Sequence, residues 1–253
     1  MGASGIIGKN FKILNRQKYN TVLTYNSNKT KKFKKFDIKF DSFSNFLKQN
    51  GIPDVIIFGI SISNHDKASS FKNESNRVNH RLLVDLLKKF KKLPETKVIF
   101  LSSQMVLDGK KKFSSESVKP KPIITYGKQK LKVENFIRRN LKNYIIFRLA
   151  KVYGDKINDK SLVTSFLSQI KKNKKKFIAA NDQFFNPLYV FDLIKIINIA
   201  IDKNLMGLYH VGGPKRYSRI EILKRVFRLI KKKNKFSCQI IGKKLNSFNQ
   251  IEK

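Results

Sequence analysis

Residues 2–8 read Gly-Ala-Ser-Gly-Ile-Ile-Gly, a G-x-x-G-x-x-G run that leads into an amphipathic stretch from Asn10 to Gln17. Small residues at a turn that opens a helix let the backbone come close to a phosphate group, and the first N–H groups of the helix point toward it. Three glycines in seven residues would also suit a simple flexible terminus, so their meaning depends on the rest of the chain.

The segments that follow alternate between strand and helix patterns. We expect helices near residues 5–17, 43–49, 75–92 and around Tyr126, and strands near residues 21–25, 55–59, 97–101 and 144–149. Strands separated by helices of this length predict an α/β fold with a parallel, doubly wound sheet. Beyond Tyr153 the alternation loosens, which predicts a second, smaller lobe.

Tyr126 and Lys130 lie in the run Tyr-Gly-Lys-Gln-Lys, and an apolar run ends earlier at the pair Ser102-Ser103. Residues four apart on a helix share one face, so the phenol and the ammonium can enter the same pocket. A nearby ammonium favours the phenolate and lowers a tyrosine pKa from its reference of about 10, as a general acid or base requires. In a lysine-rich chain the same spacing also occurs on solvated helix faces.

Composition limits the kind of protein this chain can be. Its 253 residues are 41% hydrophobic, which is enough for a buried core. The longest apolar runs, 55–62 and 194–201, are shorter than the roughly 20 residues of a membrane span. We therefore expect no membrane partner and a cytoplasmic location. Cys238 is the single cysteine, and no metal-ligand cluster is present, so we predict neither an internal disulfide nor a metal site.

The formal net charge of +38 is compatible with nucleic-acid binding, as are the lysine runs at 31–35, 171–176 and 231–233. The basic residues are mostly lysines spread over the whole chain, together with abundant Asn, Ile and Phe. This pattern is typical of an A+T-rich coding bias acting on solvated surface. We expect no specific nucleic-acid partner, and a role for the charge in attracting anionic ligands.

The glycine run and the Tyr-x-x-x-Lys motif together resemble the extended short-chain dehydrogenase/reductase superfamily, and within it the dTDP-4-dehydrorhamnose reductase family. Further matches follow in the family's order and cover most of the chain: Pro53–Ile57, Asp66–Ala68, Val78–Asn79, Leu101–Gly109, Arg148, Val152–Gly154, Asn186–Pro187, Tyr189–Val190, Asp192–Leu193, Gly207–Val211, Gly213–Pro214 and Ser218–Arg219.

The resemblance implies a Rossmann-type sheet and a division into two parts. Residues 1–154, with roughly 184–206 returning to them, would form the NAD(P)-binding domain, and residues 155–183 and 207–253 the substrate-binding lobe. It implies an NAD(P)H-dependent reductase of a 4-keto nucleotide-sugar, nominally dTDP-4-dehydrorhamnose, in deoxysugar and cell-surface polysaccharide biosynthesis. The partner would be a nucleotide-diphosphate sugar, and a homodimer is a further expectation.

The resemblance also implies catalytic roles for three residues. Tyr126 would donate a proton to the substrate carbonyl oxygen as hydride arrives from the nicotinamide. Ser103 would hydrogen-bond the same oxygen, and Lys130 would hold the nicotinamide ribose and depress the pKa of Tyr126. A strand-end cap is the alternative role for Ser103. Gln104 and Met105 stand where the family has Asp and Tyr, which leaves the identity of the sugar open.

Cofactor binding is expected from the glycine run and from the second strand region. The segment Thr24–Lys29 has no carboxylate for a ribose 2′-OH, whereas Lys29 could hold a 2′-phosphate, so we predict NADPH in preference to NADH. The residues predicted to contact the cofactor are Gly2, Gly5, Ile6, Ile7, Gly8, Lys29, Asp37 and Lys130.

Substrate binding is expected from Ser63, His65, Arg148 and Asn186. Arginine presents paired donors to phosphate oxygens, although a surface ion pair is the alternative for Arg148. Asn79 matches an asparagine of the family, and a local backbone hydrogen bond is its alternative. We expect His210 to be a packed core residue.

Two departures from the family concern the ends of the sequence. Met1 directly precedes Gly2, so the first strand of the sheet is expected to be missing, and the chain stops at Lys253 where family members continue with an Arg-Pro segment. A misplaced start codon or a fragment would explain both, and a degenerate, inactive copy stays open. The functional alternatives are an epimerase or dehydratase of the same superfamily, a non-catalytic cofactor-binding regulatory subunit, and a basic nucleic-acid binder.

Overall fold

The structure is a computed structural model that describes residues 1–62, 70–110, 114–156, 159, 161–231 and 238–245. The chain divides into two compact units. Residues 1–149 and 193–211 form unit 1, and residues 150–192 and 212–253 form unit 2. The units differ from the expected division at three segments. Residues 207–211 lie in unit 1, because they form a strand of its sheet, whereas residues 150–154 and 184–192 lie in unit 2.

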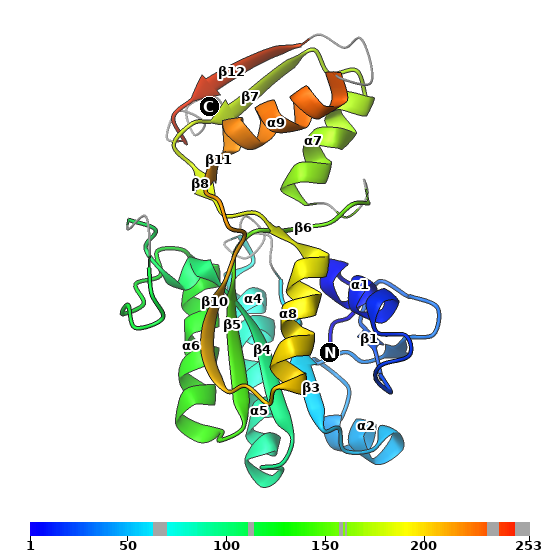
Figure 1. Cartoon of the computed structure of the whole chain (residues 1–253). Coiled ribbons are helices and arrows are strands. Elements are labelled where there is room, and N and C mark those ends of the chain that lie inside the picture. The colour runs from blue at the N-terminus through cyan, green and yellow to red at the C-terminus, as the bar shows by residue number, and fades with distance from the viewer. Residues whose placement is uncertain (63–69, 111–113, 157–158, 160, 232–237, 246–253) are drawn as a thin grey trace. The chain divides into compact units, whose positions relative to one another are not determined.

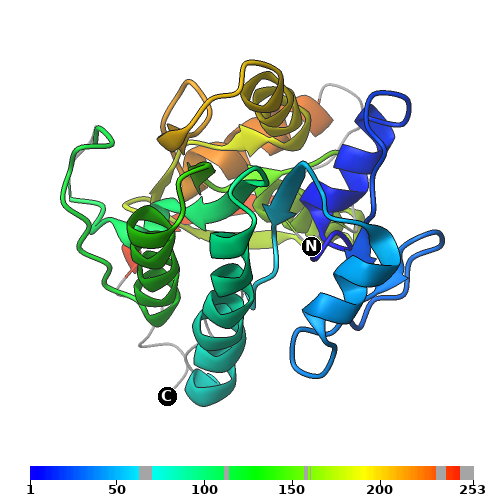
Figure 2. The ribbon, with the colours of Figure 1, turned by 90° about the horizontal axis from the view of Figure 1, so that it is seen from below.

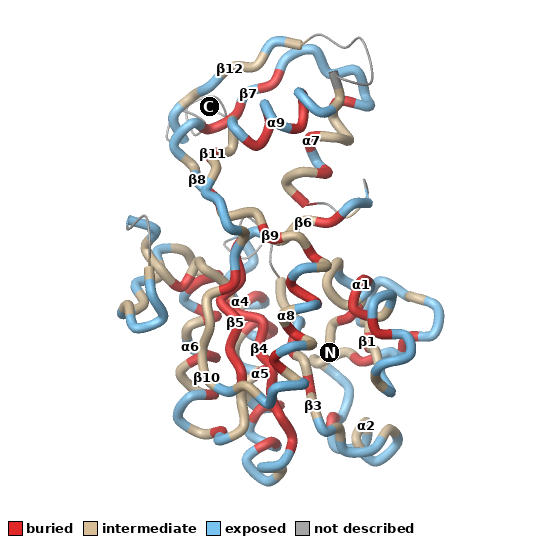
Figure 3. Tube along the Cα trace, in the orientation of Figure 1, coloured by how far each residue is buried: buried red, intermediate tan, exposed pale blue. Residues whose placement is uncertain are grey.

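The central sheet of unit 1 has four parallel strands in the order β10-β5-β4-β3. These are β10 (Gly207–Val211), β5 (Tyr144–Leu149), β4 (Lys97–Ser103) and β3 (Val55–Phe58). Parallel strands covered on both faces are expected to be apolar throughout, and β4 and β5 are buried along nearly their whole length (Figure 3).

Helices cover both faces of this sheet, which confirms the predicted doubly wound α/β fold. Helices α5 (Leu82–Lys88) and α6 (Thr125–Asn140) lie on one face, and α8 (Val190–Asp202) lies on the other (Figures 1 and 2). The core between the sheet and the first pair of helices includes Leu83, Leu87, Val133, Ile137, Ile56, Phe58, Val98 and Phe100.

The helix expected over residues 75–92 is interrupted. It consists of α4 (Lys72–Asn76), a π-helical turn η1 (Arg77–Arg81), α5, and a 3₁₀ turn η2 (Lys89–Lys92). A π-helical turn accommodates one extra residue and often occurs at a functional site. Here it contains the buried Asn79.

The N-terminal part of unit 1 holds α1 (Ile6–Leu14), α2 (Phe43–Asn50) and a small parallel pair, β1 (Thr24–Tyr25) with β2 (Lys34–Lys35). Met1 contributes two hydrogen bonds to the β3 segment: its amine donates to the Ile57 carbonyl at 2.7 Å, and its carbonyl accepts from the Gly59 N–H at 3.1 Å. Ala3 N–H donates to the Thr24 carbonyl at 2.7 Å. Residues 1–3 therefore connect the β3 and β1 backbones, although they form no strand of their own.

Unit 2 is built on the parallel strands β7 (Lys176–Ala180) and β12 (Gln239–Lys243), packed against α7 (Leu162–Lys171) and α9 (Arg219–Lys231). Two short pairs join it, β6 (Val152–Tyr153) with β9 (Leu188–Tyr189) and β8 (Phe184–Phe185) with β11 (Tyr217–Ser218). Cys238 packs, partly buried, against this core. Among the described residues no helix is long and apolar enough to cross a membrane, and no cluster of metal-ligand side chains occurs.

Candidate functional site

The three glycines of the turn before α1 have different structural roles. Gly2 has φ +73°, a conformation that residues with side chains rarely adopt, and a methyl group on Gly8 would lie 2.3 Å from the Ala3 Cα. Gly5 is exposed, and a methyl group there would meet nothing closer than the Gly2 carbonyl oxygen at 4.0 Å. The first glycine makes the turn, the third allows close packing, and the second leaves the space that a pyrophosphate needs.

The start of α1 also suits an anion. Gly5 is the N-cap residue, no side chain caps the helix, and no acidic residue lies in the first turn. The N-terminal N–H groups and the helix dipole therefore favour a phosphate near Ile6 and Ile7. This chain's own residues fit a dinucleotide at this position.

The other two predicted cofactor residues follow β1 and β2. Lys29 is exposed, and Asp37 is half-buried with its carboxylate accepting from the Lys39 N–H at 2.9 Å. The two strands are parallel, so both residues follow the carboxyl ends of strands on the same edge. Their contact with a cofactor stays a prediction.

Tyr126 and Lys130 lie on the buried face of α6, as their spacing predicts, with 9% and 2% of their surfaces exposed. The Lys130 Nζ donates to the Leu101 carbonyl at 2.9 Å and lies 5.6 Å from the centre of the Tyr126 ring. The Ser61 hydroxyl, in the loop after β3, donates to the Tyr126 Oη at 3.4 Å. The chain thus assembles this pair from α6, the end of β4 and the β3 loop.

The ionisation of this pair differs from the expectation. Burial raises the pKa of Tyr126, and the hydrogen bond from Ser61 opposes that rise. Burial lowers the pKa of Lys130 to about 7, while the Glu134 carboxylate acts in the opposite direction. The expectation that Lys130 depresses the Tyr126 pKa is wrong for the protein alone, because desolvation dominates both groups.

Ser103 ends β4, and its Oγ accepts from the Met105 N–H at 3.2 Å, which caps the 3₁₀ turn η3 (Gln104–Val106). The expected alternative role as a cap is therefore present. A hydroxyl has one donor and two acceptor positions, so the Ser103 hydrogen remains able to bond a substrate oxygen. Gly127, which the sequence analysis missed, packs against the Met105 backbone so closely that no side chain fits there.

A buried amide network ties the loop after β3 to α6. The Asn79 side chain accepts from the Ile62 N–H at 2.7 Å and donates to the Ile62 carbonyl at 3.1 Å. It also donates to the Gln129 Oε1 at 2.8 Å, and the Gln129 Nε2 donates to the Ser75 Oγ at 2.9 Å. Asn79 thus bonds backbone, but of a residue 17 positions away, and Gln129 was not foreseen because its partners are distant in sequence.

The structure places the expected substrate residues differently. Arg148 is 2% exposed and forms an ion pair with the buried Glu134 at 2.7 Å, so it is neither a surface ion pair nor open to a phosphate. Asn186 lies in unit 2, where its Nδ2 donates to the Gly213 carbonyl at 3.4 Å. Ser63 and His65 fall outside the described residues. His210 is partly buried and hydrogen-bonded, so the expectation of a packed core histidine is wrong.

Unit 2 contains a pair of cations that the sequence analysis did not select. Lys151 is exposed, yet desolvation of its ammonium and the charge of Arg219 lower its pKa. Burial lowers the pKa of Arg219, whose Nη1 donates to the Gln183 Oε1 at 3.2 Å. Within the described part of the chain, neither cation forms an ion pair. Two repelling cations of this kind suit a multiply charged anion.

The unit 1 sheet is of the Rossmann type, and a glycine turn precedes α1. A tyrosine and a lysine lie one turn apart on a buried helix face. Together these features define the class of extended short-chain dehydrogenase/reductase folds. Residues 1–249 match the model of the RmlD substrate binding domain family. The chain belongs to this family, which confirms the predicted resemblance.

Solved structures support the fold. A hypothetical dTDP-4-dehydrorhamnose reductase from Sulfolobus tokodaii is 24% identical, with a TM-score of 0.82 over 96% of this chain and 84% of that one. The dTDP-4-dehydrorhamnose reductase of Bacillus anthracis in complex with NADP gives the same identity and score over 98% and 83%. A Bacillus cereus UDP-glucuronic acid 4-epimerase, in complex with UDP-glucuronic acid and NAD, is 20% identical with a TM-score of 0.81 over 96% of this chain and 84% of that chain.

The curated relatives that the chain matches are named as a subunit of another enzyme and not as a sugar reductase. Methionine adenosyltransferase 2 subunit beta of Xenopus tropicalis is 27% identical over 132 residues, which are 49% of this chain and 39% of that protein. The mouse subunit is 22% identical over 228 residues, covering 87% of this chain and 68% of that protein. The chain spans about two fifths of the length of the frog and fish relatives that it matches.

Proposed function

We propose that this protein is an NAD(P)H-dependent reductase of a 4-keto nucleotide-sugar, with dTDP-4-dehydrorhamnose as the nominal substrate. The observation that carries the proposal is the buried pair of Tyr126 and Lys130 on a helix packed against β4 and η3, where Ser103 lies, in a fold whose glycine turn leaves room for a pyrophosphate. A role in deoxysugar and polysaccharide biosynthesis, a cytoplasmic location and a homodimer belong to the same proposal.

Gly2, Gly5, Ile6, Ile7 and Gly8 would hold the cofactor pyrophosphate. The nicotinamide, when bound, supplies the hydride for the substrate carbonyl carbon. Membership of the RmlD substrate binding domain family and the likeness to folds solved with NADP or NAD support a nicotinamide cofactor. We propose NADPH, because the exposed Lys29 follows the carboxyl end of β1 and could hold a 2′-phosphate, and the 24–29 segment has no carboxylate for a ribose 2′-OH.

The catalytic residues each handle one atom or group. Burial keeps Tyr126 protonated at neutral pH, so its phenol can donate a proton to the carbonyl oxygen as that oxygen gains charge. The Ser103 hydroxyl would donate a hydrogen bond to the same oxygen and fix its position. Lys130, with a pKa of about 7, would bond the ribose hydroxyls and, as the ammonium, stabilise the phenolate left behind on Tyr126.

The cations of unit 2 support a nucleotide-diphosphate substrate. Lys151 and Arg219 would share the diphosphate, whose negative charge would offset the desolvation and the repulsion from Arg219 that together lower the pKa of Lys151. This assignment replaces Arg148, whose guanidinium is already bound to Glu134. Asn186, Ser63 and His65 remain proposed contacts of the sugar nucleotide.

The test is a cofactor-oxidation assay of the purified protein with NADPH and NADH against a panel of keto nucleotide-sugars, with each reduced sugar identified as product. We expect oxidation that depends on the sugar nucleotide and a higher kcat/KM with NADPH. Cofactor binding without turnover of any sugar would contradict the reductase. A ten-fold preference for NADH would contradict the cofactor assignment alone.

A second candidate is a cofactor-binding subunit of another enzyme, because the curated relatives are named as the beta subunit of methionine adenosyltransferase 2. It predicts cofactor binding without sugar reduction, and a change in a partner enzyme's activity on addition of this protein. An epimerase or dehydratase of the superfamily would instead convert the sugar nucleotide without net cofactor oxidation. The same assay, with product analysis, separates the three.

A further inference from the structure

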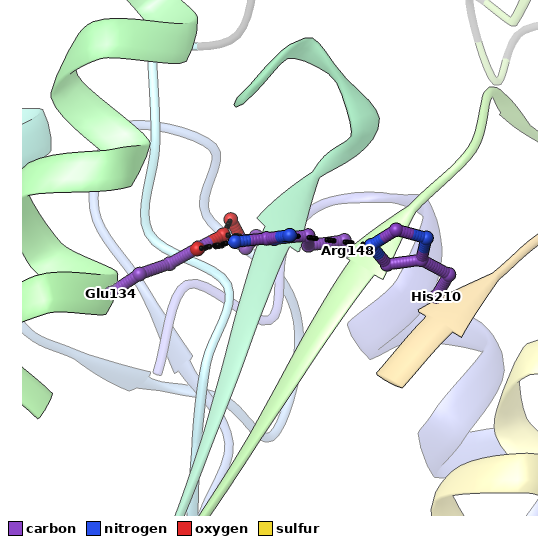
Figure 4. Close-up of polar contacts among 4 residues, drawn as sticks. Glu134, Arg148 and His210 are labelled. Atoms are coloured by element: carbon purple, nitrogen blue, oxygen red, sulfur yellow. Dashed lines mark hydrogen bonds and ion pairs between the residues drawn. The ribbon is translucent and has the colours of Figure 1, made fainter. Parts of the chain in front are cut away.

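Glu134 lies on α6 four residues after Lys130, so the two side chains are neighbours on one helix face. Its carboxylate is fully buried and held by two elements other than its own helix. The Ser102 hydroxyl of β4 donates to Oε1 at 2.5 Å. The Arg148 guanidinium of β5 donates through Nε to both oxygens at 3.2 and 3.1 Å, and through Nη2 to Oε2 at 2.7 Å (Figure 4).

The network extends across the sheet. Ser102, Arg148 and His210 are register partners on β4, β5 and β10, so they form a row at one level of the sheet. The His210 Nε2 lies 3.3 Å from Nη1 of Arg148, and its Nδ1 lies 3.0 Å from the Ser114 carbonyl oxygen. Arginine can only donate, so the His210 Nε2 accepts from Arg148 and its Nδ1–H donates to the Ser114 carbonyl.

The row also reaches the segment that leads into α6. The His210 N–H donates to the Glu116 carboxylate at 2.8 Å, next to the contact between its ring and Ser114. Three strands and this segment therefore fix the position of one carboxylate, a single turn away from the proposed catalytic lysine. A buried ion pair adds little net stability compared with apolar residues of the same size, so stability alone does not explain it.

We infer that Glu134 is a positioning residue for the proposed reduction: held by Ser102 and Arg148, with His210 behind Arg148, its carboxylate lies one helical turn from Lys130 and keeps that side chain as an ammonium for the cofactor ribose. This inference rests on the proposed function. The contacts of Lys130 itself agree with it, because β4 offers the ammonium only the Leu101 carbonyl and the Phe100 ring, 4.7 Å away at its centre, and neither has a charge.

Lys130 can gain or lose its proton near neutral pH. Burial lowers its pKa to about 7, and Glu134 opposes that shift, so loss of the carboxylate would lower the pKa further. The charged and titratable side chains on or against this part of α6 include Tyr126, Lys132 and Glu134 on the helix itself, His80 on η1 near Lys132, Arg148 on β5, and His210 on β10 next to Arg148.

The experiment measures NADPH affinity and kcat/KM of the full chain as functions of pH, for Glu134→Gln and Glu134→Asp beside wild type. Gln keeps the size but removes the charge, whereas Asp keeps the charge. NADPH affinity should fall at high pH, as Lys130 loses its proton. We expect the midpoint pH of this fall to be lower by about one unit or more in Glu134→Gln, and to equal that of wild type in Glu134→Asp. Lower pH should restore affinity to Glu134→Gln. The control is Asp85→Asn, an exposed carboxylate on α5 paired with Lys88, whose profile should equal that of wild type.

Glu134→Gln leaves Arg148 buried without a counter-ion. The double variant Glu134→Gln/Arg148→Gln lacks both charges, so its shift should have the same direction but be smaller, because the repulsion between Arg148 and Lys130 is removed as well. Equal shifts in the Gln and Asp variants, or a loss of affinity that is the same at every pH, would overturn the inference. So would an unshifted profile in a folded variant that lacks the carboxylate. Failure of the wild type to bind nicotinamide cofactor or reduce a sugar would instead reject the proposed function.

Discussion

Gly127 and Met105 approach each other more closely than any residue with a side chain permits: a methyl group on Gly127 would lie 2.0 Å from the Met105 carbonyl oxygen. The contact sets the first turn of α6 against η3, and therefore sets Tyr126 beside the end of β4. Both groups in the contact are backbone, so neither can rotate away.

Gly127→Ala should therefore destabilise the protein by about 1–3 kcal/mol, the usual cost of overpacking, and abolish turnover. Urea unfolding and the cofactor-oxidation assay measure the two effects. Gly59→Ala is the matched control for stability, since its methyl group would meet ordinary contacts at 3.5 Å or more. Equal unfolding free energies for the two variants would contradict the close contact.

Tyr126→Phe removes the proton donor and keeps the ring in its buried place. We expect kcat to fall by about 10²- to 10⁴-fold, the contribution typical of a general acid, with NADPH affinity retained. Stopped-flow turnover and cofactor titration check this, and Tyr144→Phe, on β5, is the control for loss of a phenol. Turnover at the wild-type rate in Tyr126→Phe would exclude the proposed mechanism.

Lys130 should make stability depend on pH. Its pKa is about 7 in the folded protein and near the reference of 10.5 when unfolded, so between these values the unfolded chain binds more protons. The unfolding free energy then rises with pH from 7 toward 10.5, and that contribution is lost as pH falls. The wild type should gain stability relative to Lys130→Met between pH 7 and pH 9 in urea melts. A constant difference between the two would show that Lys130 does not titrate in this range.

Gly5 and Gly8 should respond differently to the same substitution. Gly8→Ala forces a methyl group into Ala3 and should cost about 1–3 kcal/mol of stability, whereas Gly5→Ala meets open space and should fold normally. Gly5→Ala should nevertheless bind NADPH more weakly, because the methyl group occupies the space proposed for the pyrophosphate. Thermal melts and cofactor titrations distinguish the two, and normal cofactor affinity in Gly5→Ala would count against this site.

Lys151→Met and Arg219→Met should each raise KM for the sugar nucleotide about tenfold, since a hydrogen bond to a charged group contributes about 1.5–3 kcal/mol. The dissociation constant for NADPH should not change. Lys243→Met, on β12 of the same unit, controls for a general loss of positive charge. An unchanged KM in both variants, or an equal rise in the control, would reject the diphosphate contact.

Local spacing made part of this molecule predictable. Strand 144–149 and the shared face of Tyr126 and Lys130 follow from residues close in sequence, because hydrophobic runs and four-residue spacing act within one element. The glycine run likewise placed a turn and a helix start correctly, since each glycine meets a backbone constraint a few residues away.

Distant pairings could not be predicted in the same way. Arg148 was expected at a phosphate, but its partner Glu134 lies on a different element, and only the packed sheet brings them together. The direction of the Tyr126 pKa shift was also wrong, because it depends on how completely the fold removes water from the phenol. The Asn79–Gln129 bond, between residues 50 positions apart, has no signal in the spacing of either residue.

At the π-helical turn Arg77–Arg81, the number of residues matters more than their type, because that number sets how the helix before the turn is rotated relative to the helix after it. A single extra residue turns everything before it by about 100° relative to everything after it. Ser75 can then meet Gln129 while Leu83 and Leu87 face the sheet. Substitution of the exposed Arg77 or Arg81 by another residue leaves this rotation unchanged. Deletion of either residue would rotate Ser75 away from Gln129, although the composition of the helix would hardly change.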